Sequence, residues 1–159
     1  MFGLVTVKTE VLINAPIHHC FDLARNIDVH TQTVWKHTKE RAIAGTIEGM
    51  INKGETVTFQ ATHFLIRQKL TSKITEYERP YLFVDEMSKG AFKSLRHEHI
   101  FEEHDGMTLM KDILVFEAPF GLIGWITERL ILKRYMKSFL EHRNNQLKIR
   151  AEELFTDLD

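Results

Sequence analysis

The chain has 159 residues, a net charge of −1 and one cysteine, Cys20. This length suits a single domain with a sizeable core, which we expect to span residues 1–159. The charge argues against a nucleic-acid partner, and the lone cysteine excludes an internal disulfide and a multi-cysteine metal site. No signal-peptide pattern opens the sequence, and no apolar run reaches the roughly 18–20 residues of a membrane helix. We therefore expect a cytoplasmic protein without stable membrane insertion.

The first quarter of the chain predicts one strand followed by two short helices. Residues 4–13 alternate, with valines and Ile13 on one face and polar residues on the other, as in a strand with one solvated side. Pro16 ends this strand and suits the start of a helix over 17–26. Cys20 falls on the apolar face of that helix, where we expect a buried thiol. Asp28 is the expected N-cap of a second short helix that ends near Val34.

Between residues 41 and 117 the sequence predicts six consecutive strands. Glycines and Pro80 punctuate this part of the chain at the expected turns. Short connections between successive strands indicate an antiparallel meander. The expected strands lie near residues 41–47, 55–65, 68–78, 81–88, 95–104 and 107–117.

The final third of the sequence changes to helical spacing. Apolar residues recur at intervals of three and four from Leu122 to about Leu154. A helix of about 30 residues would be about 45 Å long, so it must lie across a large curved sheet and bury one stripe against it. The order β-α-α-β6-α therefore predicts an α+β fold, in which a seven-stranded curved antiparallel sheet wraps round a long C-terminal helix. Such a sheet leaves a hydrophobic cavity beside the helix.

The expected strand at residues 95–104 places two histidines on an apolar face. Leu95, His97, His99 and Phe101 share one side, whereas Arg96 and neighbouring glutamates lie on the other. Imidazoles on such a face fit the wall of a cavity better than a dry core. We predict a ligand-binding cavity whose lining comprises Phe59, His63, Phe83, Asp85, Met87, Phe92, Leu95, His97, His99, Phe101, Phe116, Trp125, Met136 and Phe139.

Several motifs resemble those of the SRPBCC superfamily, also called START-like or Bet v 1-like, and the resemblance covers essentially the whole chain. They are Ile13–Pro16 with the following Cys20-Phe21, Phe83–Glu86, Gly90–Phe92, Arg96–Phe101, and a C-terminal set. That set comprises Ala118-Pro119, Gly121, Arg134-Tyr135, Phe139 and Arg143-Asn144. The central and C-terminal motifs are similar to those of a bacterial subgroup in the polyketide cyclase/dehydrase-like branch. The resemblance implies the helix-grip fold, and Leu95 departs from the tryptophan that subgroup members often carry, which would widen the cavity.

The cavity histidines admit two chemical roles besides ligand orientation. Together with His63 and Asp85, they could supply four ligands to a divalent metal, although hydrogen-bonded polar groups in a wet cavity are the favoured interpretation. His97 or His99, oriented by Asp85, could also act in acid–base catalysis, and the resemblance implies such use of the cavity in aromatases and cyclases. Arg143 either reaches inward to Asp85 or Asp112 or extends into solvent.

Three functions follow from this pattern. The favoured one is non-enzymatic binding of a hydrophobic or amphipathic small molecule or lipid, with no cofactor and no metal. The second is an enzyme of the cyclase, dehydratase or hydrolase type that uses His97 or His99 as a base. The third is a protein-interaction module that binds through a sheet edge or through the apolar segment Phe120–Trp125, which could alternatively form a lid over the cavity.

Overall fold

The computed structural model describes residues 3–118 and 125–157, and side chains from residue 129 onward in the second range. Its order of elements is the predicted one, a strand, two short helices, six strands and a long helix. The strands are β1 (Leu4–Ile13), β2 (Arg41–Gly45), β3 (Thr56–His63), β4 (Ile66–Glu78), β5 (Leu82–Lys89), β6 (Ser94–His104) and β7 (Met107–Glu117). The helices are α1 (Ile17–Ala24), α2 (Ile27–Thr33), the short 3-10 helix η1 (Lys36–Thr38) and α3 (Trp125–Thr156).

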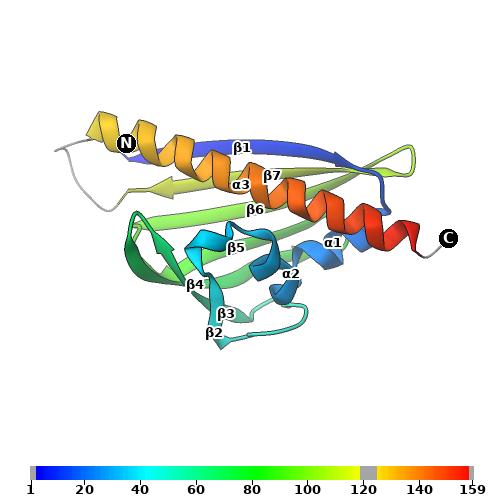
Figure 1. The fold of residues 1–159 in the computed structure, drawn as a ribbon, viewed down its shortest axis with the longest axis horizontal. Helices are drawn as coiled ribbons and strands as arrows, with labels where there is room; N and C mark the ends of the chain where they lie inside the picture. The colour runs from blue at the N-terminus through cyan, green and yellow to red at the C-terminus, as the bar shows by residue number, and fades with distance from the viewer. Residues whose placement is uncertain (1–2, 119–124, 158–159) are drawn as a thin grey trace.

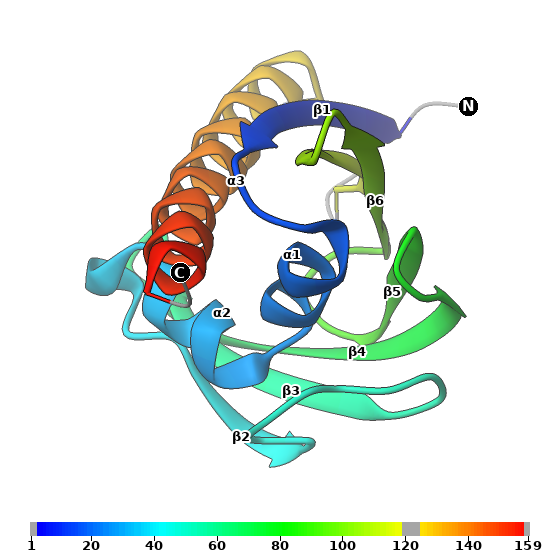
Figure 2. The same ribbon diagram turned by 90° about the vertical axis from the view of Figure 1, so that its right-hand side faces the viewer.

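The seven strands form one antiparallel sheet in the order β1-β7-β6-β5-β4-β3-β2 (Figure 1). Each strand from β2 to β6 pairs with the next one along the chain, whereas β1 pairs with β7 and so forms one edge of the sheet. Seen from the end of the molecule, the sheet curves round from β1 through β6 and β5 to β4, β3 and β2 (Figure 2). This arrangement confirms the predicted α+β helix-grip fold.

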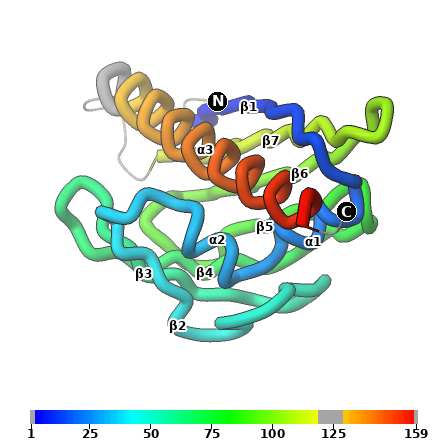
Figure 3. The backbone as a smooth tube through the Cα atoms, turned by 45° about the vertical axis from the view of Figure 1, so that its right-hand side comes forward, coloured from blue at the N-terminus to red at the C-terminus, as the bar shows by residue number. Residues whose placement is uncertain are grey.

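Helix α3 runs across the open side of the curved sheet, and α1 and α2 lie beside its C-terminal half (Figure 3). The predicted first helix, 17–26, ends two residues early at Ala24. The prediction that Asp28 caps the second helix is wrong, because the side chain of Asn26 accepts the hydrogen bond from the Val29 amide at 3.1 Å. Either residue type can cap a helix, so composition alone did not separate them.

Two apolar clusters hold the helices against the sheet. One surrounds Phe21 of α1, whose ring packs edge-on against Tyr77, Phe83 and Phe101 at centroid distances of 5.5, 5.4 and 5.3 Å. Cys20 is fully buried in this cluster, and burial raises the pKa of its thiol to about 11, as expected for a packing residue. The other cluster joins Phe116 of β7 to Phe139 and Leu140 of α3. Within the described residues, no helix has the length and apolarity needed to span a membrane.

Candidate functional site

The site is built on the inward face of β6, where the period of the strand brings alternate side chains to one side. Leu95, His97, His99 and Phe101 are all buried there. The antiparallel register places Asp85 of β5 opposite His97, and Asp112 of β7 opposite His99. Two carboxylates therefore flank two imidazoles on three adjacent strands, which is why these four side chains interact so closely.

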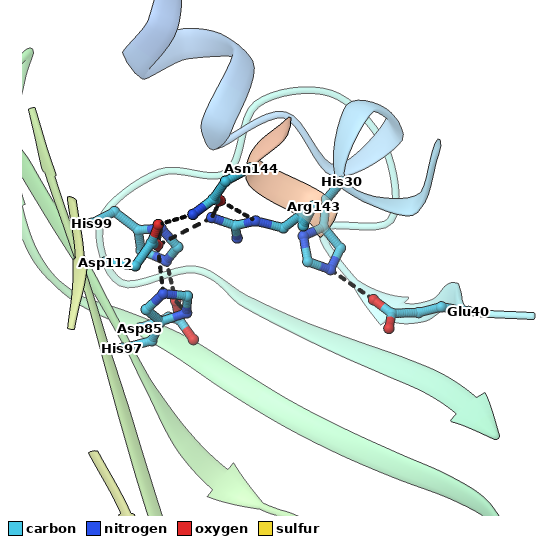
Figure 4. A network of polar contacts seen from close by, with 8 residues as sticks. All are labelled: His30, Glu40, Asp85, His97, His99, Asp112, Arg143 and Asn144. Carbon is cyan, nitrogen blue, oxygen red and sulfur yellow. Dashed lines mark hydrogen bonds and ion pairs between the residues drawn. The ribbon is translucent and has the colours of Figure 1, made fainter. Parts of the chain in front are cut away.

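Asp112 is the centre of a buried polar network (Figure 4). Its side chain has no exposed surface. Its Oδ1 accepts hydrogen bonds from His97 Nε2 at 2.6 Å and Arg143 Nη2 at 3.1 Å, and its Oδ2 accepts one from Asn144 Nδ2 at 2.6 Å. Asn144 Oδ1 in turn accepts from the Arg143 guanidinium at 3.0 and 3.1 Å. Of the two alternatives for Arg143, the inward one is therefore the one adopted.

His99 lies between the two carboxylates. Its Nε2 donates to Asp85 Oδ2 at 2.8 Å, and its Nδ1 lies 3.2 Å from Asp112 Oδ1, close enough for attraction but outside hydrogen-bond geometry. The ring stacks on Phe83 with centroids 4.1 Å apart and also contacts the His97 ring at 3.8 Å. An imidazolium suits this position, because both of its nitrogens face carboxylates and an aromatic face covers it.

His97 has the opposite protonation. A carboxylate can only accept, so Nε2 of His97 carries the proton donated to Asp112, and Nδ1 has a lone pair. That Nδ1 lies 4.0 Å from Asp85 Oδ2, which is too far for a hydrogen bond. His97 lines the cavity described below. Its Nδ1 is thus an acceptor without a partner among the described residues.

The pKa directions agree with this assignment. Burial opposes the charged form of His99, but the carboxylates of Asp112 and Asp85 outweigh it and raise the pKa of His99 above 6.5. Burial and the neighbouring His99 charge lower the pKa of His97 below 6.5. Burial likewise opposes ionisation of Asp112, yet Arg143 and the imidazoles hold its pKa well below 3.8. With His99 protonated and His97 neutral, the two carboxylates, the guanidinium and the imidazolium balance in charge.

A cavity of about 630 Å³ lies between this wall, the sheet and α3. Ten of the predicted lining residues do line it. They are Phe59, His63, Phe83, Asp85, Phe92, Leu95, His97, His99, Met136 and Phe139.

Three predicted lining residues do not reach the cavity. Phe101 and Phe116 are 1% and 0% exposed and fill the two apolar clusters, because they lie toward opposite ends of the inward face. Met87 packs against the cluster around Phe116. The side chain of Trp125 lies outside the described residues, and so does nearly all of the segment Phe120–Trp125 that could form a lid.

The cavity has polar groups that the sequence analysis did not identify. His30 of α2 pairs with Glu40 at 2.7 Å, and both line the cavity on the far side of Arg143 from Asp112 (Figure 4). The Tyr135 hydroxyl of α3 is hydrogen-bonded to His63 Nδ1 at 2.6 Å across the gap between helix and sheet. The sequence pattern indicated Asp112 only as a possible partner for Arg143. Its alternation with Met110 and Leu114 on the inward face of β7 was the signal that could have assigned it to the site.

Three of the four residues considered as possible metal ligands lie together in the structure. Asp85, His97 and His99 present ligand atoms within 4.8 Å of one another, whereas His63 is engaged by Tyr135. A metal ion would have to displace the proton that the carboxylates stabilise on His99, and it would lie close to the Arg143 charge. The donor set therefore fits a hydrogen-bonded cluster better than a metal centre.

Comparison with known proteins identifies the fold. No model of a known protein family matches the sequence, and no curated protein matches it. The di-domain ARO/CYC protein StfQ from the steffimycin biosynthetic pathway has a TM-score of 0.77 and 9% identity, with 95% of this chain and 51% of that chain covered. A START superfamily protein from Mycobacterium smegmatis has a TM-score of 0.71 and 14% identity, with 94% of this chain and 98% of that chain covered. The protein TTHA0849 from Thermus thermophilus has a TM-score of 0.73 and 15% identity, with 92% of this chain and 97% of that chain covered.

These similarities establish that the chain has the START-like helix-grip fold, as the sequence motifs predicted. The di-domain protein is about twice as long as the part that the chain matches, so the chain corresponds to one half of it. At such low identities the likeness concerns the arrangement of the backbone, and the chemistry of the site must be argued from its own residues.

We predict that the two imidazoles titrate on opposite sides of pH 6.5. His99 should lose its proton above that pH and His97 should gain one only below it, for the reasons given above. Nitrogen-detected NMR of the histidine rings would measure both transitions. Replacing Asp112 by Asn should lower the pKa of His99, and a His99 that titrates below His97 in the wild-type protein would contradict the assignment.

We also predict that Asp112→Asn destabilises the fold by about 3–5 kcal/mol at neutral pH, since it leaves Arg143 buried without its counter-charge. The depressed pKa of Asp112 stabilises the wild-type protein above pH 3.8, and this contribution is lost as the pH falls. The variant should therefore lose less stability on acidification. Urea unfolding at several pH values measures both effects. The exposed turn residue Asp105 is the control, because Asp105→Asn should change stability by less than about 0.5 kcal/mol.

Proposed function

We propose that this chain binds a small hydrophobic or amphipathic molecule in the cavity between the sheet and α3. The observation that carries the proposal is a cavity of about 630 Å³ with apolar residues over most of its lining and a neutral polar network on one wall. This volume and this mixture of surfaces are typical of ligand sites. A filled core would be denser, since protein interiors usually leave few voids larger than a water molecule.

The polar wall favours a ligand with a hydrogen-bond donor at one end. His97 Nδ1 can accept a hydrogen bond but has no donor among the described residues. The Asp85 side chain is 20% exposed, and His99 bonds only to its Oδ2. A hydroxyl group could donate to either atom, whereas a carboxylate there would meet two acceptors. The remaining contacts come from Phe92, Leu95 and Phe139, which suit an aliphatic or aromatic body. The favoured ligand class is thus a lipophilic alcohol or phenol.

We predict that filling the cavity prevents binding. In Leu95→Trp the larger side chain would occupy the ligand volume, and the Kd for the fluorescent probe N-phenyl-1-naphthylamine should rise at least about tenfold, which corresponds to about 1.4 kcal/mol. Leu12→Trp is the matched control, since Leu12 of β1 is 44% exposed and lies outside the lining. Thermal unfolding of both variants checks that they fold. The proposal fails if the wild-type protein does not bind the probe, or if both substitutions weaken binding equally.

A second candidate function is general-base catalysis by His97, as in an enzyme of the cyclase or dehydratase type. The specific observation in its favour is the neutral His97 ring with an unpartnered Nδ1 in the cavity, beside a charged His99 that cannot itself accept a proton. The described part of the chain offers no nucleophile hydrogen-bonded to that nitrogen. Abstraction of a proton next to a carbonyl group is the step that such a base could perform.

We predict that His97→Gln, if this second function holds, lowers exchange of the α-protons of a medium-chain β-keto ester in D₂O by about 10²–10⁴-fold, the usual contribution of a general base. NMR follows the exchange, and fluorescence competition follows ester binding, which should change little. His63→Gln provides the control, because His63 also lines the cavity but is hydrogen-bonded to Tyr135 and not to the network around Asp112. If the wild-type protein exchanges these protons no faster than His97→Gln does, general-base catalysis by His97 is contradicted and only the binding function remains.

A further inference from the structure

The entrance of the cavity carries exposed apolar side chains. At the β3–β4 turn, Phe64, Leu65 and Ile66 are 51%, 99% and 62% exposed, and Ile131 of α3 is 51% exposed. The Phe64 ring lies 4.4 Å from that of Tyr135, so the turn meets α3 at this place. Phe64, Ile66 and Ile131 also line the cavity, whereas Leu65 does not. We call these four residues, Phe64, Leu65, Ile66 and Ile131, the mouth patch.

The backbone at this turn makes the exposed side chains unexpected. Phe64 and Leu65 have φ angles of 50° and 64°, in the left-handed region that Gly and Asn adopt far more readily. Two-residue hairpin turns in this conformation usually carry those residues. Leu65 is not buried, and its backbone conformation is unfavourable for a large apolar residue, so neither explains its presence at the tip. Contact with an external apolar surface would explain it.

Basic residues lie beside the mouth patch, on η1 and at the start of β4. Three chain segments meet there, because Arg67 donates to the carbonyl groups of Thr38 and Lys39 at 3.1 and 3.0 Å, and the Trp35 ring packs against Tyr135 at 5.3 Å. Residues 34–39 and 62–70 contain no Asp or Glu, and Glu40, which follows the first range, pairs with His30. The basic residues of these two ranges, which we call the collar, are Lys36, Lys39, Arg67 and Lys69.

We propose that the mouth patch and the collar dock this protein onto the surface of an anionic lipid bilayer. Apolar side chains that project from a tight turn can enter the boundary between headgroups and acyl chains. Lysine and arginine side chains beside them complement the negative surface potential of anionic lipids. The opening of the cavity then faces the bilayer, so a lipophilic ligand can pass between membrane and cavity without crossing water. Docking itself does not depend on what the cavity holds.

The test is co-sedimentation of the full chain with vesicles of phosphatidylcholine, with and without phosphatidylglycerol, at low and high salt. Binding should require phosphatidylglycerol and weaken with salt, since the attraction is partly electrostatic. Leu65→Asn should lower the partition coefficient about tenfold by removing the most exposed apolar side chain. Its thermal midpoint should stay equal or rise, because Asn tolerates the left-handed conformation. The control Ile149→Asn, on α3 and 49% exposed, should bind as the wild-type protein does.

The proposal is overturned if the wild-type protein does not bind anionic vesicles, or if Leu65→Asn and Ile149→Asn reduce binding equally. A concentration-dependent dimer in analytical ultracentrifugation, abolished by Leu65→Asn and without vesicle binding, would overturn it in favour of a second copy on the patch. Binding of N-phenyl-1-naphthylamine without vesicles should be the same in Leu65→Asn and wild type, since Leu65 lies outside the lining. Loss of probe binding alone therefore counts against the cavity function and leaves the docking result standing.

Discussion

The buried carboxylate of Asp112 is the constraint on which the site depends. An ionised group with no exposed surface is tolerated only where opposite charge and hydrogen bonds surround it. Arg143 and Asn144 supply these from α3, and His97 supplies one from β6, so the network fixes the helix against the sheet. A well-packed apolar group could replace such a cluster at little loss of stability. Its presence beside a cavity is better explained by the polar wall that it gives to a ligand.

That network also sets different chemistry on two neighbouring histidines. Both rings belong to one strand face, with centroids 3.8 Å apart, yet the pKa of His99 is raised and that of His97 is lowered. The difference arises because His99 faces two carboxylates, whereas His97 faces one and also meets the charge on His99. A second charge on His97 would repel the first and unbalance the network. His97 is therefore the imidazole of the pair that is better suited to remain neutral, with Nδ1 free to accept a hydrogen bond.

The cavity and its entrance present different kinds of surface. One wall of the cavity carries Asp85, His97 and His99 from β5 and β6, and most of the remaining lining surface is apolar. At the mouth, apolar side chains are exposed and basic residues gather, although the chain as a whole is slightly acidic. This gradient from a charged surface through an apolar entrance to a polar inner wall suits an amphipathic molecule that enters with its polar end first.

The sequence by itself determined the order of elements, the strand faces and the presence of a gripped cavity, because alternation and helical spacing are local properties. His97, His99 and Asp85 could be assigned to one site for the same reason. Only the tertiary structure decided that Arg143 points inward, that Asp112 joins both histidines, and that Phe101 and Phe116 fill the core. Those outcomes depend on strand register and on how α3 lies on the sheet, which bring together residues such as His97 and Asp112 from separate strands. Protonation of each imidazole follows from those neighbours, and so lies beyond what spacing along one strand can specify.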